Sequence, residues 1–255
     1  MSGLEATLRA VRDRGAKSFV PYVTGGFPGV DGELLRMLAA AGADAIEVGI
    51  PHSDPIMDGG VIQEASRVAL QRGTRIGDVL ASIVDAAVEI PVAVMTYANI
   101  AHHRGYEAFC DDLARSGVDG AIVPDLPVDE AERFAALGAA RGIDVVLLAA
   151  PGTTAQRYRA IAAASHGFVY CVATYGVTGA RDQLSVTARD VVTAVRPYTD
   201  LPLLVGVGIA TPEQAGEASA FADGVIVGSA LMAPLVAGDP KGALRLAEAF
   251  RGEIL

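Results

Sequence analysis

Eight short apolar runs recur along this chain of 255 residues, and each is followed by a stretch with helical periodicity. Most of the runs are continuous rather than alternating, which is typical of parallel strands that are buried on both faces. The runs are residues 19–24, 45–49, 92–97, 120–124, 145–149, 168–172, 203–206 and 224–227. One strand and its helix take up about 32 residues, the size of a unit in a closed parallel barrel. The pattern therefore predicts an α/β fold, a (β/α)8 TIM barrel that forms one domain over residues 1–255.

Residues with strong preferences for helix ends support the predicted helices. Asp31 is a candidate N-cap, and residues 211–214 form a capping box with proline at the first helical position. Gly42, Gly73 and Gly117 stand where helices should end, because glycine readily adopts the left-handed conformation found there. These signals divide the chain into units of the expected length.

Two helices are expected in addition to those that cover the barrel. One spans about residues 4–14, before the first strand, and the other spans residues 230–236, after the last. A doubly wound open sheet is the rival architecture, but it would usually have fewer strands. Residues 25–28 do not match the GxGxxG fingerprint that a dinucleotide-binding sheet carries after its first strand.

Charge and composition exclude several classes of protein. The net charge is −10 and no basic stripe is present, so we expect no nucleic acid partner. No apolar run approaches the ~18 residues of a membrane-spanning helix, and residues 1–17 lack the apolar core of a signal peptide. Cys110 and Cys171 have no metal-ligand spacing, so we expect two buried free thiols and a cytoplasmic setting.

Two acidic residues lie in and after the second predicted strand. Glu47 is inside the apolar run 45–49, where a carboxylate is costly unless it is used or hydrogen-bonded. Burial should raise the pKa of Glu47 and allow proton exchange near neutral pH, although a purely structural carboxylate is the alternative. Asp58 lies in the long loop 51–60. It could pair with Glu47 for acid–base chemistry, or simply cap the helix that starts near Val61.

Three glycine-rich loops follow the last three predicted strands. They are residues 176–179, 206–208 and 228–230, and the last of them opens the short helix 230–236. Barrels often bind phosphate with the loops after strands seven and eight and with the N-terminus of that extra helix. Each loop alone could be an ordinary tight turn, but together they predict a phosphate site built from backbone N–H groups.

Other polar residues point toward the same rim, the C-terminal ends of the strands, where barrel active sites lie. They are Tyr97 and Asn99 after the third strand, Asp125 after the fourth, and Tyr170 in the sixth. The four histidines do not share metal-ligand spacing, so no metal site is expected. No lysine lies in a predicted strand and no nucleophile elbow is present, which argues against Schiff-base and serine-hydrolase chemistry.

Several motifs, in order along the chain, resemble one family closely. They are PYVTGGFP (21–28), AGADAIEVGIPHSDP (41–55), MDG (57–59), TYAN (96–99), PDLP (124–127), GVTG (176–179), GVGI (206–209) and GSA (228–230). These segments are similar to those of the tryptophan synthase alpha subunit, and the stretch from Glu47 to Asp58 is the most specific. Other phosphate-binding barrels share only the late glycine loops.

The resemblance implies a lyase that cleaves indole-3-glycerol phosphate into indole and glyceraldehyde 3-phosphate. Glu47 would shuttle a proton, and Asp58 would hold the indole N–H and stabilise the positive charge that develops on the ring. The residues expected to contact the substrate are Tyr22, Tyr97, Tyr170, Thr178, Gly179, Gly208, Gly228 and Ser229. The resemblance implies no cofactor in this chain. It implies an α2β2 assembly with a tryptophan synthase beta subunit that carries pyridoxal phosphate, with the loop 51–60 facing that partner.

Alternative functions use the same fold. One is a stand-alone lyase that releases free indole, another is a non-catalytic barrel that regulates a partner enzyme, and a third is a different phosphosugar barrel. The third would require a lysine or a different carboxylate pair at the strand ends. The chain also departs from the family's usual pattern at Gly60, Thr174 and Tyr175, which bears on activation by a partner more than on the bond that is broken.

Overall fold

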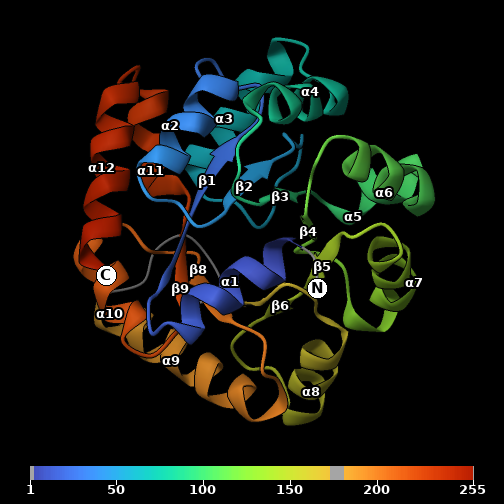
Figure 1. Cartoon of the computed structure of the whole chain (residues 1–255), viewed down its shortest axis with the longest axis vertical. Coiled ribbons are helices and arrows are strands. Elements are labelled where there is room, and N and C mark those ends of the chain that lie inside the picture. Colours follow the sequence, from blue (N-terminus) through green and yellow to red (C-terminus); the bar gives the residue numbers. More distant parts are fainter. Residues whose placement is uncertain (1–2, 173–180, 255) are drawn as a thin grey trace.

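The strands of this computed structural model form a parallel barrel (Figure 1). The structure describes residues 3–172 and 181–254, so Thr174, Tyr175, Thr178 and Gly179 lie outside the described residues. Within that part, nine strands follow the order β5-β4-β3-β2-β1-β9-β8-β7-β6. They are β1 (Ser18–Thr24), β2 (Ile46–Gly49), β3 (Val92–Met95), β4 (Gly120–Ile122), β5 (Asp144–Val146), β6 (Leu148–Ala149), β7 (Val169–Val172), β8 (Leu203–Gly206) and β9 (Gly224–Val227).

The barrel closes where the fifth predicted run is divided into two short strands. β5 pairs with β4 while β6 pairs with β7, and only Leu147 separates β5 from β6. The carbonyl of Leu147 accepts a hydrogen bond from the N–H of Tyr170 at 3.1 Å, which joins the two sides. β5 and β6 are therefore consecutive parts of one barrel strand, and the predicted (β/α)8 barrel is confirmed.

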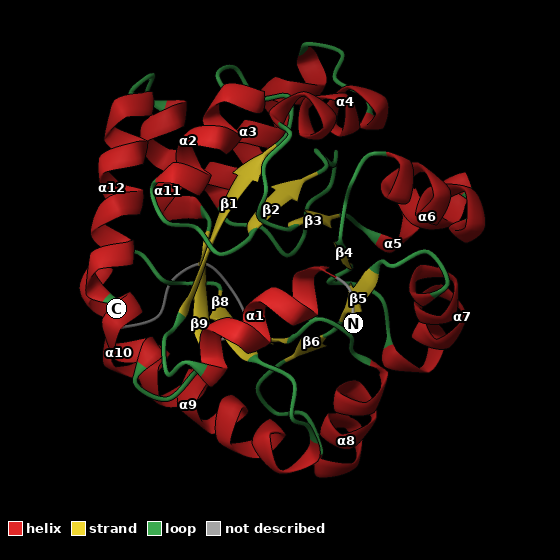
Figure 2. Cartoon of the chain, viewed as in Figure 1, coloured by secondary structure: helices red, strands yellow, loops and turns green. Residues whose placement is uncertain are grey.

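Helices surround the strands on the outside of the barrel and cover one of its ends (Figure 2). In the described residues they are α1 (Gly3–Asp13), α2 (Gly32–Ala40), α3 (Gly60–Gln71), α4 (Ile76–Ala86), α5 (Ala98–Arg104), α6 (Tyr106–Arg115), α7 (Val128–Ala139), α8 (Ala155–Ala164), α9 (Arg181–Val195), α10 (Pro212–Ser219), α11 (Ser229–Val236) and α12 (Pro240–Glu253), with a 3₁₀ turn η1 (Arg196–Tyr198). α1 and α11 confirm the two additional helices predicted from the sequence. Two further helices are not predicted by the sequence pattern, because two helices (α3 and α4) lie between β2 and β3 and two (α5 and α6) lie between β3 and β4.

Two predicted strands end earlier than their apolar runs do. β3 ends at Met95 rather than at Tyr97, and β4 ends at Ile122 rather than at Pro124. Tyr97 instead has extended backbone as the N-cap of α5. Tyr97 and Val123, in the last part of these runs, are buried although they lie beyond the ends of the strands. Their apolar character therefore reflects burial and not pairing in the sheet.

The predicted helix ends are confirmed by their hydrogen bonds. The carboxylate of Asp31 accepts from two N–H groups in the first turn of α2, both at 3.1 Å. Thr211 and Gln214 form the predicted capping box at the start of α10. Glycines with left-handed backbone follow α2, α3 and α6: Gly42 (φ 96°), Gly73 (φ 84°) and Gly117 (φ 69°).

The interior of the barrel is filled with apolar side chains and is closed at one end by α1. Leu4 and Leu8 of α1 belong to the same buried cluster as Val20, Ile122 and other inward-facing strand residues. Figure 1 shows α1 crossing the barrel. The carboxylate of Asp144, the first residue of β5, accepts a hydrogen bond from an N–H of α1 at 3.1 Å. Because α1 covers the end where the strands begin, the end where they finish remains for a site.

Both cysteines are buried free thiols, as predicted. Burial raises the pKa of Cys110 to about 11 and that of Cys171 to about 12, so neither is a reactive thiolate at neutral pH. In the described part of the chain, no helix is both long enough and apolar enough to cross a membrane.

Candidate active site

Glu47 is placed inside the barrel by the alternation of β2. Its neighbours Ile46 and Val48 pack into the apolar layer between strands and helices, so the side chain between them points inward. In the parallel pairing of β1 with β2, Glu47 lies next to Tyr22, and on the other side it lies next to Ala93 of β3. The side chain of Glu47 therefore lies inside the barrel, on the strand predicted from the sequence.

The carboxyl group of Glu47 is buried and unpartnered. Its residue is only 1% exposed, and among the described residues neither carboxyl oxygen has a hydrogen-bond partner. Burial, followed by the negative charge of Asp58, raises the pKa of Glu47 to about 8. A carboxyl group in this state is protonated near neutral pH and can give up and regain a proton at modest cost.

Asp58 comes from the loop between β2 and α3 and is also buried. The N-cap of α3 is Gly59, with no side-chain capping bond, so the alternative that Asp58 caps this helix is wrong. Its carboxylate instead accepts a hydrogen bond from the hydroxyl of Tyr97 at 3.3 Å. Burial raises the pKa of Asp58 to about 6, against the opposing effects of that hydrogen bond and of His52. Asp58 therefore stays largely ionised at neutral pH beside a protonated Glu47.

Two tyrosines share the space around these acids. Burial, with smaller effects from Glu47 and Asp58, raises the pKa of both Tyr22 and Tyr170 well above the usual range. Each tyrosine ring lies against a glycine of the neighbouring strand, Tyr22 against Gly49 and Tyr170 against Gly206. A β-carbon added to Gly49 would lie 2.1 Å from the hydroxyl oxygen of Tyr22. Tyr22, Tyr170 and the two acids thus converge on one mouth of the barrel, as the sequence predicted.

The loop after β8 contains two consecutive residues with left-handed backbone. Val207 and Gly208 have φ values of 67° and 93°, in the left-handed region. For a β-branched residue such as Val207, this conformation is strained, and strained backbone is concentrated at functional sites. Gly208 follows β8 at the end of the barrel strand, and its binding of phosphate stays a prediction.

The second half of the predicted phosphate site is the N-terminus of α11. Gly228 is its N-cap, Ser229 its first residue, and no side-chain cap is made in the described structure. The first N–H groups of a helix attract anions. A β-carbon added to Gly228 would contact Ile62 and the ring of Tyr22, both at 3.4 Å, so this glycine borders the same mouth. The third predicted loop, with Thr178 and Gly179, lies outside the described residues.

Some polar residues of the rim have structural roles. The carboxylate of Asp125 accepts a hydrogen bond from the N–H of Ala98 at 2.8 Å and so caps α5. The side chain of Asn99 is hydrogen-bonded to the ring of His52. No group of three potential metal ligands occurs among the described residues. Sequence reasoning gave Gly49 no part in the site, although a glycine at an inward position beside a buried tyrosine is a usable signal.

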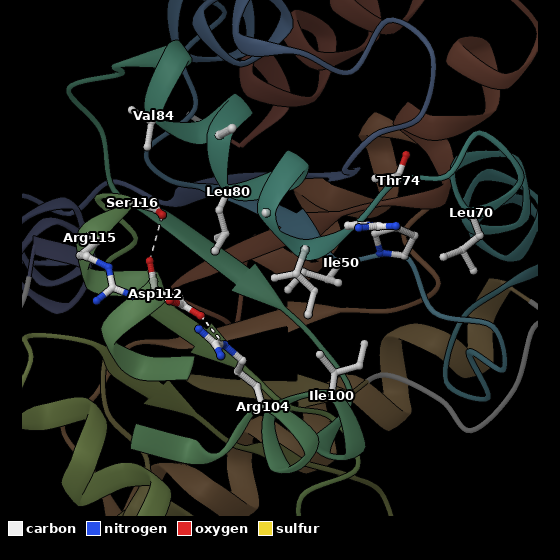
Figure 3. Close-up of a pocket in the computed structure, with 15 residues that line it drawn as sticks. Ile50, Leu70, Thr74, Leu80, Val84, Ile100, Arg104, Asp112, Arg115 and Ser116 are labelled. Carbon is white, nitrogen blue, oxygen red and sulfur yellow. Dashed lines mark hydrogen bonds and ion pairs between the residues drawn. The ribbon is translucent and has the colours of Figure 1, made fainter. Parts of the chain in front are cut away.

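A hollow of about 780 Å³ lies outside the barrel and is not this site (Figure 3). Leu80 of α4 and Ile100 of α5 line it together with arginines of α5 and α6. Neither Glu47 nor Asp58 reaches it. The candidate active site is therefore the region around the buried Glu47 and Asp58, and not this outer hollow.

Comparison with known proteins agrees with this arrangement. A family model described as tryptophan synthase alpha chain matches residues 8–250. The chain belongs to the tryptophan synthase alpha chain family. Among curated relatives, the tryptophan synthase alpha chain of Synechocystis sp. is 42% identical over 259 residues, covering 100% of this chain and 98% of the relative. The alpha chain of Streptomyces avermitilis is 42% identical over 256 residues, covering 98% of this chain and 92% of the relative.

Solved structures extend the likeness to the fold. Tryptophan synthase from Mycobacterium tuberculosis matches with a TM-score of 0.90 at 38% identity, covering 99% of this chain and 98% of that one. Tryptophan synthase subunit alpha from Legionella pneumophila matches with a TM-score of 0.90 at 32% identity, covering 100% of this chain and 98% of that one. The resemblance to the tryptophan synthase alpha chain family that the sequence motifs indicate is therefore confirmed over residues 8–250 of this chain.

Proposed function

We propose that this chain cleaves indole-3-glycerol phosphate into indole and glyceraldehyde 3-phosphate, and passes the indole to a tryptophan synthase beta subunit. The observation that carries the proposal is Glu47, a buried and unpartnered carboxyl group with a pKa of about 8, beside an ionised Asp58. Leaving such a group without a partner is costly, and the cost is understandable if a substrate supplies the partner. Membership of the tryptophan synthase alpha chain family identifies that substrate.

In the proposed reaction, Glu47 acts first as an acid and then as a base. Its proton goes to the indole carbon that bears the side chain, which places a positive charge on the ring nitrogen. The carboxylate of Asp58 holds the ring N–H and stabilises this charge. Ionised Glu47 then takes the proton of the neighbouring side-chain hydroxyl as the carbon–carbon bond breaks. The electrons of that bond restore the indole ring, the hydroxyl carbon becomes an aldehyde, and Glu47 is protonated again.

The rest of the mouth holds the substrate in place. Gly208, Gly228 and Ser229 bind the phosphate through N–H groups and the serine hydroxyl, with Thr178 and Gly179 expected to complete the site. The net charge of −10 repels an anionic substrate over long distances, so the phosphate must be held by local contacts. Backbone N–H groups at a helix N-terminus provide such contacts. Tyr22 and Tyr170 flank the indole, and Tyr97 acts on Asp58. No cofactor takes part in any of these steps.

The proposal includes a setting and a partner. The whole chain, residues 1–255, acts as one barrel domain in the cytoplasm. Its partner is a beta subunit with pyridoxal phosphate, in an α2β2 assembly that the loop 51–60 faces. The alternative of a non-catalytic barrel leaves the cost of burying Glu47 without an explanation.

The experiment is a direct assay of indole release. The purified chain is incubated with indole-3-glycerol phosphate, with and without a beta subunit, and indole is measured. We expect slow release by the chain alone and a large increase with the beta subunit. Fast release that the beta subunit leaves unchanged would favour a stand-alone lyase. No indole under either condition would contradict the proposed function.

A further inference from the structure

The hydroxyl of Tyr97 is held between two groups of the loop that follows β2. It accepts a hydrogen bond from the N–H of Met57 at 3.0 Å and lies 3.3 Å from Oδ2 of Asp58. An amide N–H can only donate, so the hydroxyl uses a lone pair for Met57 and directs its single proton at Asp58. Among the described residues, no other side chain donates to this carboxylate. The orientation of Asp58 therefore depends on where Tyr97 places its hydroxyl.

The ring of Tyr97 is in turn held by His52. The two rings are stacked, with their centroids 4.5 Å apart and their planes at 28°. Both imidazole nitrogens are occupied: Nδ1 accepts a hydrogen bond from the N–H of Asp54 at 3.1 Å, and Nε2 lies 3.1 Å from Oδ1 of Asn99. Since Nδ1 accepts, Nε2 carries the proton and donates to Asn99. These two bonds fix the imidazole in one orientation and present its flat face to Tyr97.

We propose that His52 is a positioning residue for the lyase reaction: its ring holds Tyr97 in the orientation that aims the carboxylate of Asp58 at the indole N–H. This inference rests on the function proposed above and deepens it. His52 acts through Tyr97 and not on the substrate itself. Its effect should be felt mainly in the transition state, where positive charge develops on the ring and a misdirected carboxylate stabilises it less well.

Two substitutions at this position separate stacking from hydrogen bonding. His52→Ala removes the ring, whereas His52→Phe keeps a flat face against Tyr97 and loses both nitrogens. We expect His52→Ala to lower kcat about tenfold, since small displacements of catalytic groups are costly, while KM changes by less than about twofold. His52→Phe should recover most of that loss. His103→Ala is the matched control, because His103 is an exposed histidine of α5.

A second readout does not depend on turnover. The hydrogen bond from Tyr97 lowers the pKa of Asp58, so loosening it should raise that pKa. Both His52 variants lose the direct effect of His52 on the pKa of Asp58, so the two variants are compared with each other. Carboxyl carbon NMR of the whole chain should show Asp58 titrating at higher pH in His52→Ala than in His52→Phe, and at its wild-type pH in His103→Ala. Equal Asp58 titrations in the two His52 variants overturn the inference, as do equal losses of kcat in these variants. A wild-type chain that releases no indole contradicts the proposed function instead, and the NMR titration still decides the role of His52.

Discussion

The ring of Tyr170 occupies the space that a side chain at Gly206 would need. A β-carbon added to Gly206 would lie 2.2 Å from the hydroxyl oxygen of Tyr170 and 2.5 Å from the ring carbon that bears it. The two residues belong to neighbouring strands, β7 and β8. Tyr22 and Gly49 repeat the relationship on β1 and β2, at 2.1 Å. Each buried tyrosine of the mouth thus requires a glycine beside it.

Gly206→Ala should destabilise the fold through this contact. We expect the free energy of unfolding to fall by about 1–3 kcal/mol, the usual cost of overpacking a core. In a Tyr170→Leu background the cost should shrink, because all three atoms nearest to the added β-carbon belong to Tyr170. Denaturant unfolding of the four proteins in this cycle gives the answer, with Gly252→Ala as a control that meets no atom within 4 Å. Strictly additive costs would show that the two residues do not compete for space.

The pH dependence of kcat/KM should be bell-shaped. Asp58 must be ionised and its pKa is about 6, while Glu47 must begin protonated and its pKa is about 8. Activity should therefore fall below the first value and above the second. Tyr97→Phe removes the hydrogen bond that lowers the pKa of Asp58, so its acid limb should move to higher pH while the alkaline limb stays. Since the substrate phosphate has a second pKa of about 6, only the shift between variants is diagnostic. A Tyr97→Phe profile identical to that of the wild type contradicts this assignment.

The same buried carboxyl group should make stability depend on pH. In the folded protein the pKa of Glu47 is about 8, raised from the 4.5 of an exposed glutamate. The folded state therefore holds this proton more tightly than the unfolded state, and the group's contribution to stability falls as pH rises between those two values. Glu47→Gln removes that dependence. Denaturant unfolding at about pH 6 and about pH 9 should show the variant gaining relative to the wild type at the higher pH. A constant difference would mean that Glu47 is not buried in the way described.

The phosphate site can be tested without disturbing the fold. Gly228 has φ −112°, which any residue can adopt, and its added β-carbon would make ordinary contacts at 3.4 Å. Gly228→Ala should therefore fold normally but narrow the approach to the N-terminus of α11. We expect KM to rise about tenfold, the loss of roughly one good hydrogen bond to a charged group, with little change in kcat. Measured KM and melting temperature decide the matter, and an unchanged KM would exclude Gly228 from the phosphate site.

The barrel could be predicted from the sequence because its signals are local. Continuous apolar runs, caps such as Asp31 and left-handed glycines such as Gly73 each depend on a few neighbouring residues. The division of the fifth strand at Leu147 could not be predicted in this way. It arises because β5 and β6 pair with strands on opposite sides, a property of closure that no single segment contains.

The two acids were predictable for a different reason. Glu47 is a charged residue within an apolar strand, which is a conflict visible in the sequence itself. Asp58 was ambiguous, because a helix cap and a buried carboxylate leave the same local pattern. Only the three-dimensional contact with Tyr97 removes the ambiguity. The role of His52 depends on a stacking contact with a residue 45 positions away in the sequence, so no local signal reveals it.

Replacing Glu47 by glutamine tests the central claim most directly, because it keeps the shape of the side chain and removes the exchangeable proton. Indole release from indole-3-glycerol phosphate should fall about a thousandfold, within the range for losing a general acid–base group. Binding of a phosphate ligand such as glycerol 3-phosphate should remain at the wild-type level, since the phosphate site lies at the other end of the substrate. Indole release within a few-fold of the wild type would contradict the assignment of Glu47 as the group that moves the proton.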